Sequence, residues 1–144
     1  ARLSCVGKTY VYRIWRGPEP NVFERPYLCF LDGPLDVAAM RRAAAALCGT
    51  HDYRAFCSLK RPKKSTVRTV TAIELTEHGP ELRLRVTGDG FLYHMVRILT
   101  GTLVAAGRGE LAPEDMAAIL ASGDRTRAGA TMPACGLCLE EVYY

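Results

Sequence analysis

One long apolar run constrains the fold of this chain more than any other part of the sequence. The run follows a glycine turn at residues 88–90 and reaches Gly107 without a proline. On a helical projection its apolar side chains form one stripe with further apolar positions around it, namely Leu92, Met95, Val96, Leu99, Leu103 and Ala106, with Ile98, Val104 and Ala105 outside the stripe. We therefore predict a strand end, a glycine turn and a long helix that is buried on more than one face.

Arg97 is the single cation within this predicted helix, and it lies away from the main stripe, near Tyr93 and Gly101. A guanidinium that is buried requires an anion. The helix alone favours an ordinary explanation, in which Arg97 reaches solvent or pairs with a local acid such as Asp89. The alternative is a functional anion supplied from elsewhere.

Length and composition indicate one ordinary domain with a hydrophobic core. The chain has 144 residues and a net charge of +4, and 15 of its 19 basic residues are arginine, which is compatible with a phosphate-bearing partner. No apolar run is long enough to span a bilayer. The six cysteines are expected to be reduced thiols, which favours a cytoplasmic location. The chain opens on Ala1 rather than methionine, so its beginning need not be a biological terminus.

The remaining segments predict a mixed fold. Period-two patterns, turn residues and capping residues give the following order: a strand at 7–15, a short extended segment at 25–30, a helix from the N-cap Asp36 to Leu47, a hairpin at 67–76 and 81–87, the central helix, a helix from 112 to about 122, and a closing strand at 137–144. Tyr53 and Phe56 are expected to pack in the core. This order predicts an α+β two-layer sandwich, with a mainly antiparallel sheet and helices on one face.

A basic segment lies between the first helix and the hairpin. Five cations and no acids occur in residues 60–68: Lys60, Arg61, Lys63, Lys64 and Arg68. On charge alone, a phosphate-binding loop and an ordinary solvated loop are equally consistent with this run.

Cys135 and Cys138 have the spacing of half a zinc site or of a redox pair. No second close pair follows, and the three histidines show no ligand spacing. We therefore expect no metal and no cofactor, and keep a zinc or redox module only as a rival interpretation.

Four segments resemble the tRNA pseudouridine synthase A (TruA) family. Residues 88–101, Gly-Asp-Gly-Phe-Leu-Tyr-His-Met-Val-Arg-Ile-Leu-Thr-Gly, resemble its Phe-hydrophobe-x-His-Met-Val-Arg signature. Residues 8–12 resemble its Lys/Arg-x-Tyr-x-Tyr strand, residues 51–56 resemble its connection rich in aromatic residues, and residues 124–137 resemble its Asp-Arg-x-x-Ala stretch. The resemblance covers nearly the whole chain, with the motifs in the family's order.

The resemblance implies the C-terminal, ferredoxin-like or RRM-like half of an enzyme that converts uridine to pseudouridine in the anticodon arm of tRNA without cofactor or metal. It implies two active-site residues, Tyr10 at the target base and Arg97 in a salt bridge with the catalytic aspartate. It also implies substrate-binding positions at His94, Leu137, Arg125 and the basic residues Lys60, Arg61, Lys63, Lys64 and Arg68.

The same resemblance implies three partners, which are tRNA, an N-terminal half of the same protein, and a second copy of the chain in a homodimer. The sequence has no Gly-Arg-Thr-Asp run, the family motif that carries the nucleophilic aspartate. We therefore expect the 144 residues to be inactive alone. The alternative function is that of a non-catalytic RRM-like RNA-binding domain.

Overall fold

The structure is a computed structural model that describes residues 7–16, 29–31, 34–58 and 65–143. The elements in chain order are β1 (Gly7–Trp15), β2 (Cys29–Phe30), α1 (Val37–Leu47), β3 (Gly49–Asp52), η3 (Arg54–Phe56), β4 (Val67–His78), β5 (Glu81–Gly88), α2 (Met95–Gly107), η4 (Pro113–Asp115), α3 (Met116–Ser122), η5 (Arg125–Arg127), η6 (Ala134–Gly136) and β6 (Leu137–Tyr143). None of the helices in these ranges is long and apolar enough to cross a lipid bilayer.

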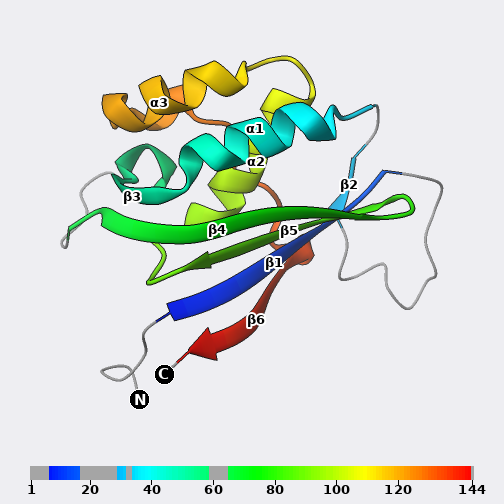
Figure 1. Cartoon of the computed structure of the whole chain (residues 1–144), viewed down its shortest axis with the longest axis horizontal. Coiled ribbons are helices and arrows are strands. Elements are labelled where there is room, and N and C mark those ends of the chain that lie inside the picture. The colour runs from blue at the N-terminus through cyan, green and yellow to red at the C-terminus, as the bar shows by residue number, and fades with distance from the viewer. Residues whose placement is uncertain (1–6, 17–28, 32–33, 59–64, 144) are drawn as a thin grey trace.

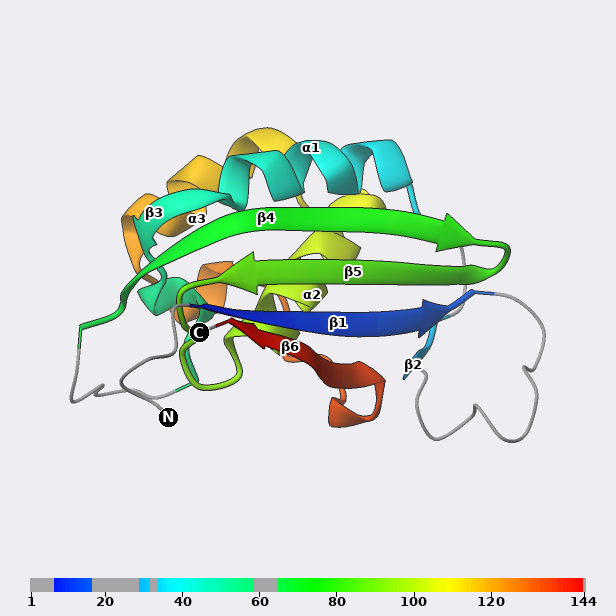
Figure 2. The same cartoon turned by 60° about the horizontal axis from the view of Figure 1, so that its bottom comes forward.

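The described strands form one sheet, in which β5 lies between β1 and β4 and β3 follows on the outer side of β4 (Figure 2). The other edge of β1 pairs with β6 along residues 7–12 and with β2 at Ile14 and Trp15. Among the described strands, only the pairing of β1 with β2 is parallel. Leaving out the short strands β2 and β3 and the additional helix α3, the chain follows a βαββαβ order, with the strands arranged β6-β1-β5-β4, which is the ferredoxin-like arrangement.

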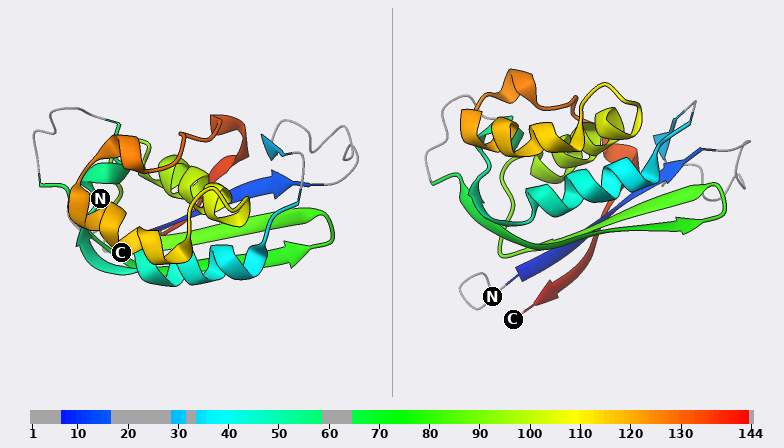
Figure 3. Two further views of the ribbon diagram at one scale, coloured as in Figure 1. Left: turned by 90° about the horizontal axis from the view of Figure 1, so that it is seen from above. Right: turned by 45° about the horizontal axis from the view of Figure 1, so that its top comes forward.

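Helices α1, α2 and α3 all lie on one face of this sheet (Figures 1 and 3). Strand alternation turns Leu82, Leu84 and Val86 of β5 toward the helices, where they are buried. Arg83 and Arg85 alternate with them and line the open face of the sheet. The structure thus confirms the predicted α+β two-layer sandwich.

Local signals placed most of the element ends correctly. The side chain of Asp36 caps α1 by accepting a hydrogen bond from the Ala39 amide at 3.1 Å. Gly123, with φ +60°, ends α3 in the left-handed region. Tyr53 and Phe56 are fully buried as predicted, and the Tyr53 hydroxyl donates to the Leu47 carbonyl oxygen at 2.6 Å.

The start of α2 differs from the sequence prediction. The apolar stripe placed Leu92 on the helix, but α2 begins at Met95. His94 has φ 60°, a left-handed conformation that an α-helix cannot contain. Residues 92–95 instead form a turn, which the Met95 amide closes by donating to the Leu92 carbonyl oxygen at 3.0 Å. The remainder of the stripe, from Met95 to Ala106, is buried as expected.

Candidate active site

A pocket of about 200 Å³ lies where β1 and the start of β6 meet the turn before α2. Its lining residues are Tyr10, Phe91, Leu92, His94, Met95, Val96, Arg97, Ala134 and Leu137. We call it the Tyr10 pocket. Two positions that the family resemblance implies to be catalytic, Tyr10 and Arg97, and two that it implies to bind substrate, His94 and Leu137, come together here from distant parts of the chain.

Two tyrosines of β1 have different environments. Tyr10 is half-buried in the pocket, and its ring meets that of Phe91 edge to face, with centroids 5.2 Å apart. Tyr12 is fully buried, and its hydroxyl donates to the Pro133 carbonyl oxygen at 2.5 Å. Burial raises the pKa of Tyr12 far above its ordinary value. Tyr10 is therefore the tyrosine that a ligand can reach, whereas Tyr12 belongs to the core.

Arg97 is held by the main chain of a distant segment. Its Nε donates to the Met132 carbonyl oxygen at 2.6 Å. Within the described residues, no hydrogen bond engages its two Nη atoms, and no buried side-chain nitrogen or oxygen lacks a partner. The Nη atoms are thus accessible, and they are the donors with which a guanidinium forks onto a carboxylate.

The segment that carries Met132 packs unusually tightly on α2. A Cβ built on Gly101 would lie 1.8 Å from the Ala130 carbonyl oxygen, and one built on Gly129 would lie 2.5 Å from the Thr102 amide nitrogen. The Gly129 amide also donates to the Thr102 hydroxyl at 2.9 Å. Two glycines therefore allow the backbones to touch, which fixes the position of Met132 relative to Arg97.

The charge in the Tyr10 pocket is unbalanced. Arg97 is the only permanently charged side chain among the described residues that line it, and the rest of the lining is aromatic or apolar apart from His94. An apolar wall makes a lone guanidinium attractive to an anion, because little water competes for its donors. The predicted local partner, Asp89, is used elsewhere: its carboxylate accepts from the Thr69 amide at 3.0 Å.

His94 borders the pocket in a strained conformation. It is the only described residue other than glycine with a positive φ, and its Nδ1 lies 3.1 Å from the Ser58 hydroxyl. Its ring stacks on that of Tyr93, with centroids 3.8 Å apart.

The sequence identified Tyr93 only as a neighbour of Arg97, and it did not identify Phe91 and Met132 as residues of the site. The exposed aromatic of the motif was a usable signal for Tyr93, whereas a backbone carbonyl such as that of Met132 leaves no signal in a sequence.

The described basic residues Arg68 and Arg125, which the resemblance gives as substrate-binding positions, do not line the Tyr10 pocket. Arg68 lies beside the turn that leads to Phe91, because a Cβ on Gly90 would be 3.6 Å from the Arg68 Nε. Arg125 does not line the Tyr10 pocket: its guanidinium donates to the Gly129 carbonyl oxygen at 2.8 Å and to the Thr131 hydroxyl at 3.0 Å, so it braces its own loop. The other predicted phosphate contacts, Lys60, Arg61, Lys63 and Lys64, lie outside the described residues.

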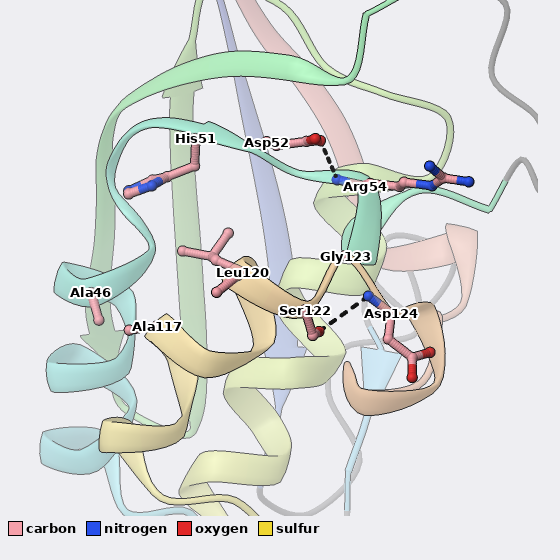
Figure 4. A pocket seen from close by; sticks show the side chains of 10 residues that line it. Ala46, His51, Asp52, Arg54, Ala117, Leu120, Ser122, Gly123 and Asp124 are labelled. Atoms are coloured by element: carbon pink, nitrogen blue, oxygen red, sulfur yellow. Dashed lines mark hydrogen bonds between the residues drawn. The ribbon is translucent and has the colours of Figure 1, made fainter.

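A larger cavity of about 840 Å³ lies between the end of α1, β3 and α3 (Figure 4). Its acidic residues are occupied in turns: Asp52 accepts from the Arg54 amide at 3.1 Å, and Asp124 accepts from the Thr126 amide at 2.9 Å. Hydrogen bonding to Thr126 lowers the pKa of Asp124. These carboxylates stabilise local structure, and none of the four residues that the Tyr10 pocket brings together lines this cavity.

Cys135 and Cys138 lie in different elements, Cys135 in η6 and Cys138 in β6. Cys138 lines the open face beside Arg13 and Arg83. Cys135 is instead exposed in η6, where Gly136 packs against the ring of Tyr12. In the described part of the chain, no group of three or more histidine, cysteine or acidic side chains is arranged to hold a metal ion. The geometry gives the zinc interpretation no support.

Comparison with known proteins shows the family of this chain. Residues 43–144 match the family described as tRNA pseudouridine synthase. Over all 144 residues, the chain is 49% identical to the tRNA pseudouridine synthase A of Moorella thermoacetica, 44% identical to that of Bacillus subtilis, and 42% identical to the tRNA pseudouridine synthase A 2 of Clostridium perfringens. These matches extend over the whole of this chain. The chain spans only 58% of the Moorella thermoacetica relative, 58% of the Bacillus subtilis relative and 59% of the Clostridium perfringens relative. The family match spans well over half of the chain, and the chain therefore belongs to the tRNA pseudouridine synthase family.

Proposed function

We propose that the protein that contains this chain converts uridine to pseudouridine in the anticodon arm of tRNA, and that the Tyr10 pocket receives the target base. The observation that carries the proposal is the convergence of Tyr10 and Arg97 on one pocket. The volume of the Tyr10 pocket, about 200 Å³, is smaller than the roughly 300–1,000 Å³ of complete small-molecule sites. This small volume supports the proposal that another part of the protein completes the site. Family membership and the names of the relatives support the same reaction.

In this reaction the bond between the ribose C1′ and N1 of uracil breaks, the base turns over, and C1′ bonds to C5 instead. The proton on C5 leaves to solvent and N1 ends protonated, so the change is an isomerisation that needs no oxidant or cofactor. The target must leave the base stack before its C1′ can be reached. The aspartate that starts the reaction is proposed to come from an N-terminal half, because the chain has no Gly-Arg-Thr-Asp run.

Tyr10 and Arg97 have complementary roles in the proposal. The Tyr10 ring, fixed edge to face by Phe91, stacks on or hydrogen-bonds the flipped base. The free Nη atoms of Arg97 pair with the incoming aspartate, while its Nε stays on the Met132 carbonyl. A guanidinium that forms hydrogen bonds with a carboxyl group lowers the pKa of that group. Arg97 would therefore keep the nucleophilic aspartate ionised.

The tRNA is proposed to run from the pocket past Arg68 toward the basic residues Lys60, Arg61, Lys63 and Lys64. Each phosphate contact that a neutral substitution removes should flatten the plot of log affinity against log salt by about one unit. An unchanged slope would assign these residues to an ordinary solvated surface. A homodimer and a cytoplasmic location accompany the proposal as predictions from the family resemblance and the cysteine content.

The decisive experiment measures tritium release from tRNA labelled at C5 of uridine. We expect turnover by the full-length protein, none by the 144 residues alone, and recovery when a separately expressed N-terminal half is added. Release by the 144 residues alone would show that the nucleophile lies within this chain. Tight RNA binding without any release by the full-length protein would favour the non-catalytic RNA-binding alternative, which the comparisons do not favour.

A further inference from the structure

Tyr93 is a large aromatic residue left exposed at the edge of the Tyr10 pocket. Its relative exposure is 55%, the highest among the large hydrophobic residues that the structure describes. The next residue, His94, lines the pocket. The turn that carries both connects β5 to α2, at the end of the sheet where β1 begins (Figure 2). The proposed function assigns roles to Tyr10 and Arg97 but none to the Tyr93 ring.

The local structure holds the Tyr93 ring in one place. Its inner face is stacked on His94, with centroids 3.8 Å apart and planes 26° apart. Ser58 holds the pair through two contacts, because its amide donates to the Tyr93 carbonyl oxygen at 3.2 Å and its hydroxyl lies 3.1 Å from the His94 Nδ1. Since one face is covered by His94, the exposed area lies on the outer face and the edge.

This arrangement is maintained against backbone strain. A residue other than glycine in the left-handed region is destabilised by roughly 1 kcal/mol or more, and such strain is concentrated at functional sites. An ordinary turn would place glycine or asparagine at position 94. The strained φ of 60° at His94 instead brings two rings into a stack beside a pocket. Burial does not account for this stack, because more than half of Tyr93 stays exposed.

We propose that the outer face of Tyr93 stacks on a nucleobase of the RNA strand, adjacent to the uridine that enters the Tyr10 pocket. The inference rests on the proposed function. When a nucleotide leaves a base stack, its neighbour loses one stacking partner, and an exposed aromatic ring can replace it. Aromatic stacking tolerates any base, because every base has a π face. Tyr93 would therefore contribute affinity for RNA without reading its sequence.

The first test separates stacking from structural support by steady-state kinetics of the full-length protein on tRNA. Tyr93→Phe keeps the ring and should leave KM within about twofold. Tyr93→Leu removes the ring and should raise KM about tenfold, with kcat nearly unchanged. The matched control is Phe30→Leu, which removes another exposed ring, 43% exposed, at the opposite end of β1. It should leave both constants unchanged.

The second test observes stacking directly. In a Tyr93→Trp variant of the full-length protein, binding of tRNA should quench tryptophan fluorescence well beyond the change that binding causes in the wild type, to which these 144 residues contribute only Trp15. A tRNA with the target uridine replaced by 5-fluorouridine serves as a second probe of the occupied site. The quenching should persist in an Arg97→Ala background, because binding of the neighbouring base does not require catalysis.

The outcomes distinguish this inference from the proposed function. If the full-length wild type releases no tritium, the proposed function fails. If the wild type is active and Tyr93→Leu lowers kcat without raising KM, then Tyr93 acts only by supporting His94, and the stacking proposal is overturned. Fluorescence at position 93 that does not respond to tRNA would also overturn it, since another protein segment would then cover the ring.

Discussion

Arg97 and Met132 are joined by two hydrogen bonds that run in opposite directions. The Arg97 Nε donates to the Met132 carbonyl oxygen at 2.6 Å, and the Met132 amide donates to the Arg97 carbonyl oxygen at 3.2 Å. The pair connects the first turn of α2 to a segment that lies 35 residues later in the chain. The side chain that faces the Tyr10 pocket is therefore positioned by backbone geometry as well as by its own helix.

The first prediction concerns the shape of this cation. Arg97→Lys should reduce tritium release by the full-length protein about 100-fold, because lysine has no Nε–H for the Met132 carbonyl and no planar fork for a carboxylate. Arg42→Lys is the control: Arg42 is exposed on α1, and its replacement should leave the rate unchanged. An Arg97→Lys enzyme with the wild-type rate would show that only positive charge is needed at this position.

The second prediction concerns the close contact behind Arg97. In Gly101→Ala the new Cβ would overlap the Ala130 carbonyl oxygen, so α2 and the segment with Met132 must separate. We expect a loss of unfolding free energy of about 1–3 kcal/mol, measured by urea denaturation, together with lower kcat.

Gly107→Ala is the matched control for this substitution, because it also lies in α2. Its new Cβ would approach the Met40 Sδ at 2.8 Å, and a flexible side chain can move away where a backbone carbonyl cannot. Replacing glycine by alanine within a helix also stabilises it by up to about 1 kcal/mol. Equal losses in the two variants would contradict a specific role for the contact at Gly101.

The sequence predicted those parts of the fold that depend on local chemistry. The alternation in β5 and the cap at Asp36 are both properties of a few consecutive residues, and the structure contains both. The grouping of Tyr10 with Arg97 was available only through the motifs of the family, because no local pattern states which segments meet.

Non-local and main-chain features were beyond the reach of the sequence. The helical period continues through Leu92, so it gave no warning that His94 is left-handed and that α2 begins later. The contact of Gly101 with Ala130 depends on how two distant backbones meet, and a glycine within a helix does not identify its partner. The turn before α2 and the close contact between Gly101 and Ala130, which together position Arg97, were therefore visible only in the structure.

The third prediction concerns the strain at His94. His94→Asn should retain near-normal stability, because asparagine tolerates φ 60° better than other residues with side chains. His94→Ala should be less stable than His94→Asn by about 1 kcal/mol, since alanine has the same steric conflict and no polar group for Ser58. Thermal or urea unfolding measures the difference. Equal stability of the two variants would mean that the turn relaxes away from the left-handed conformation.

The fourth prediction concerns the pH dependence of stability and rests on Glu81, which is 5% exposed at the start of β5. Its carboxylate accepts two hydrogen bonds from Arg13, both at 2.9 Å, and a further one from Arg83. The hydrogen bonds from Arg13, followed by the one from Arg83, lower the pKa of Glu81 from an ordinary value of 4.5 to about 2.

Because the folded state holds this carboxyl group ionised more strongly than the unfolded chain does, the stabilisation is complete above pH 4.5 and is lost as the pH falls toward about 2. The difference in pKa corresponds to about 3 kcal/mol, of which about 2 kcal/mol should be lost between neutral pH and about pH 3. Urea denaturation at a series of pH values measures this loss.

Glu81→Gln should be less stable than the wild type at neutral pH and should lack this part of the pH dependence. Glu77→Gln removes an exposed partner of Arg16 and should keep the full dependence. If Glu81→Gln and the wild type lose stability in parallel below pH 4.5, the acid sensitivity arises from other carboxylates.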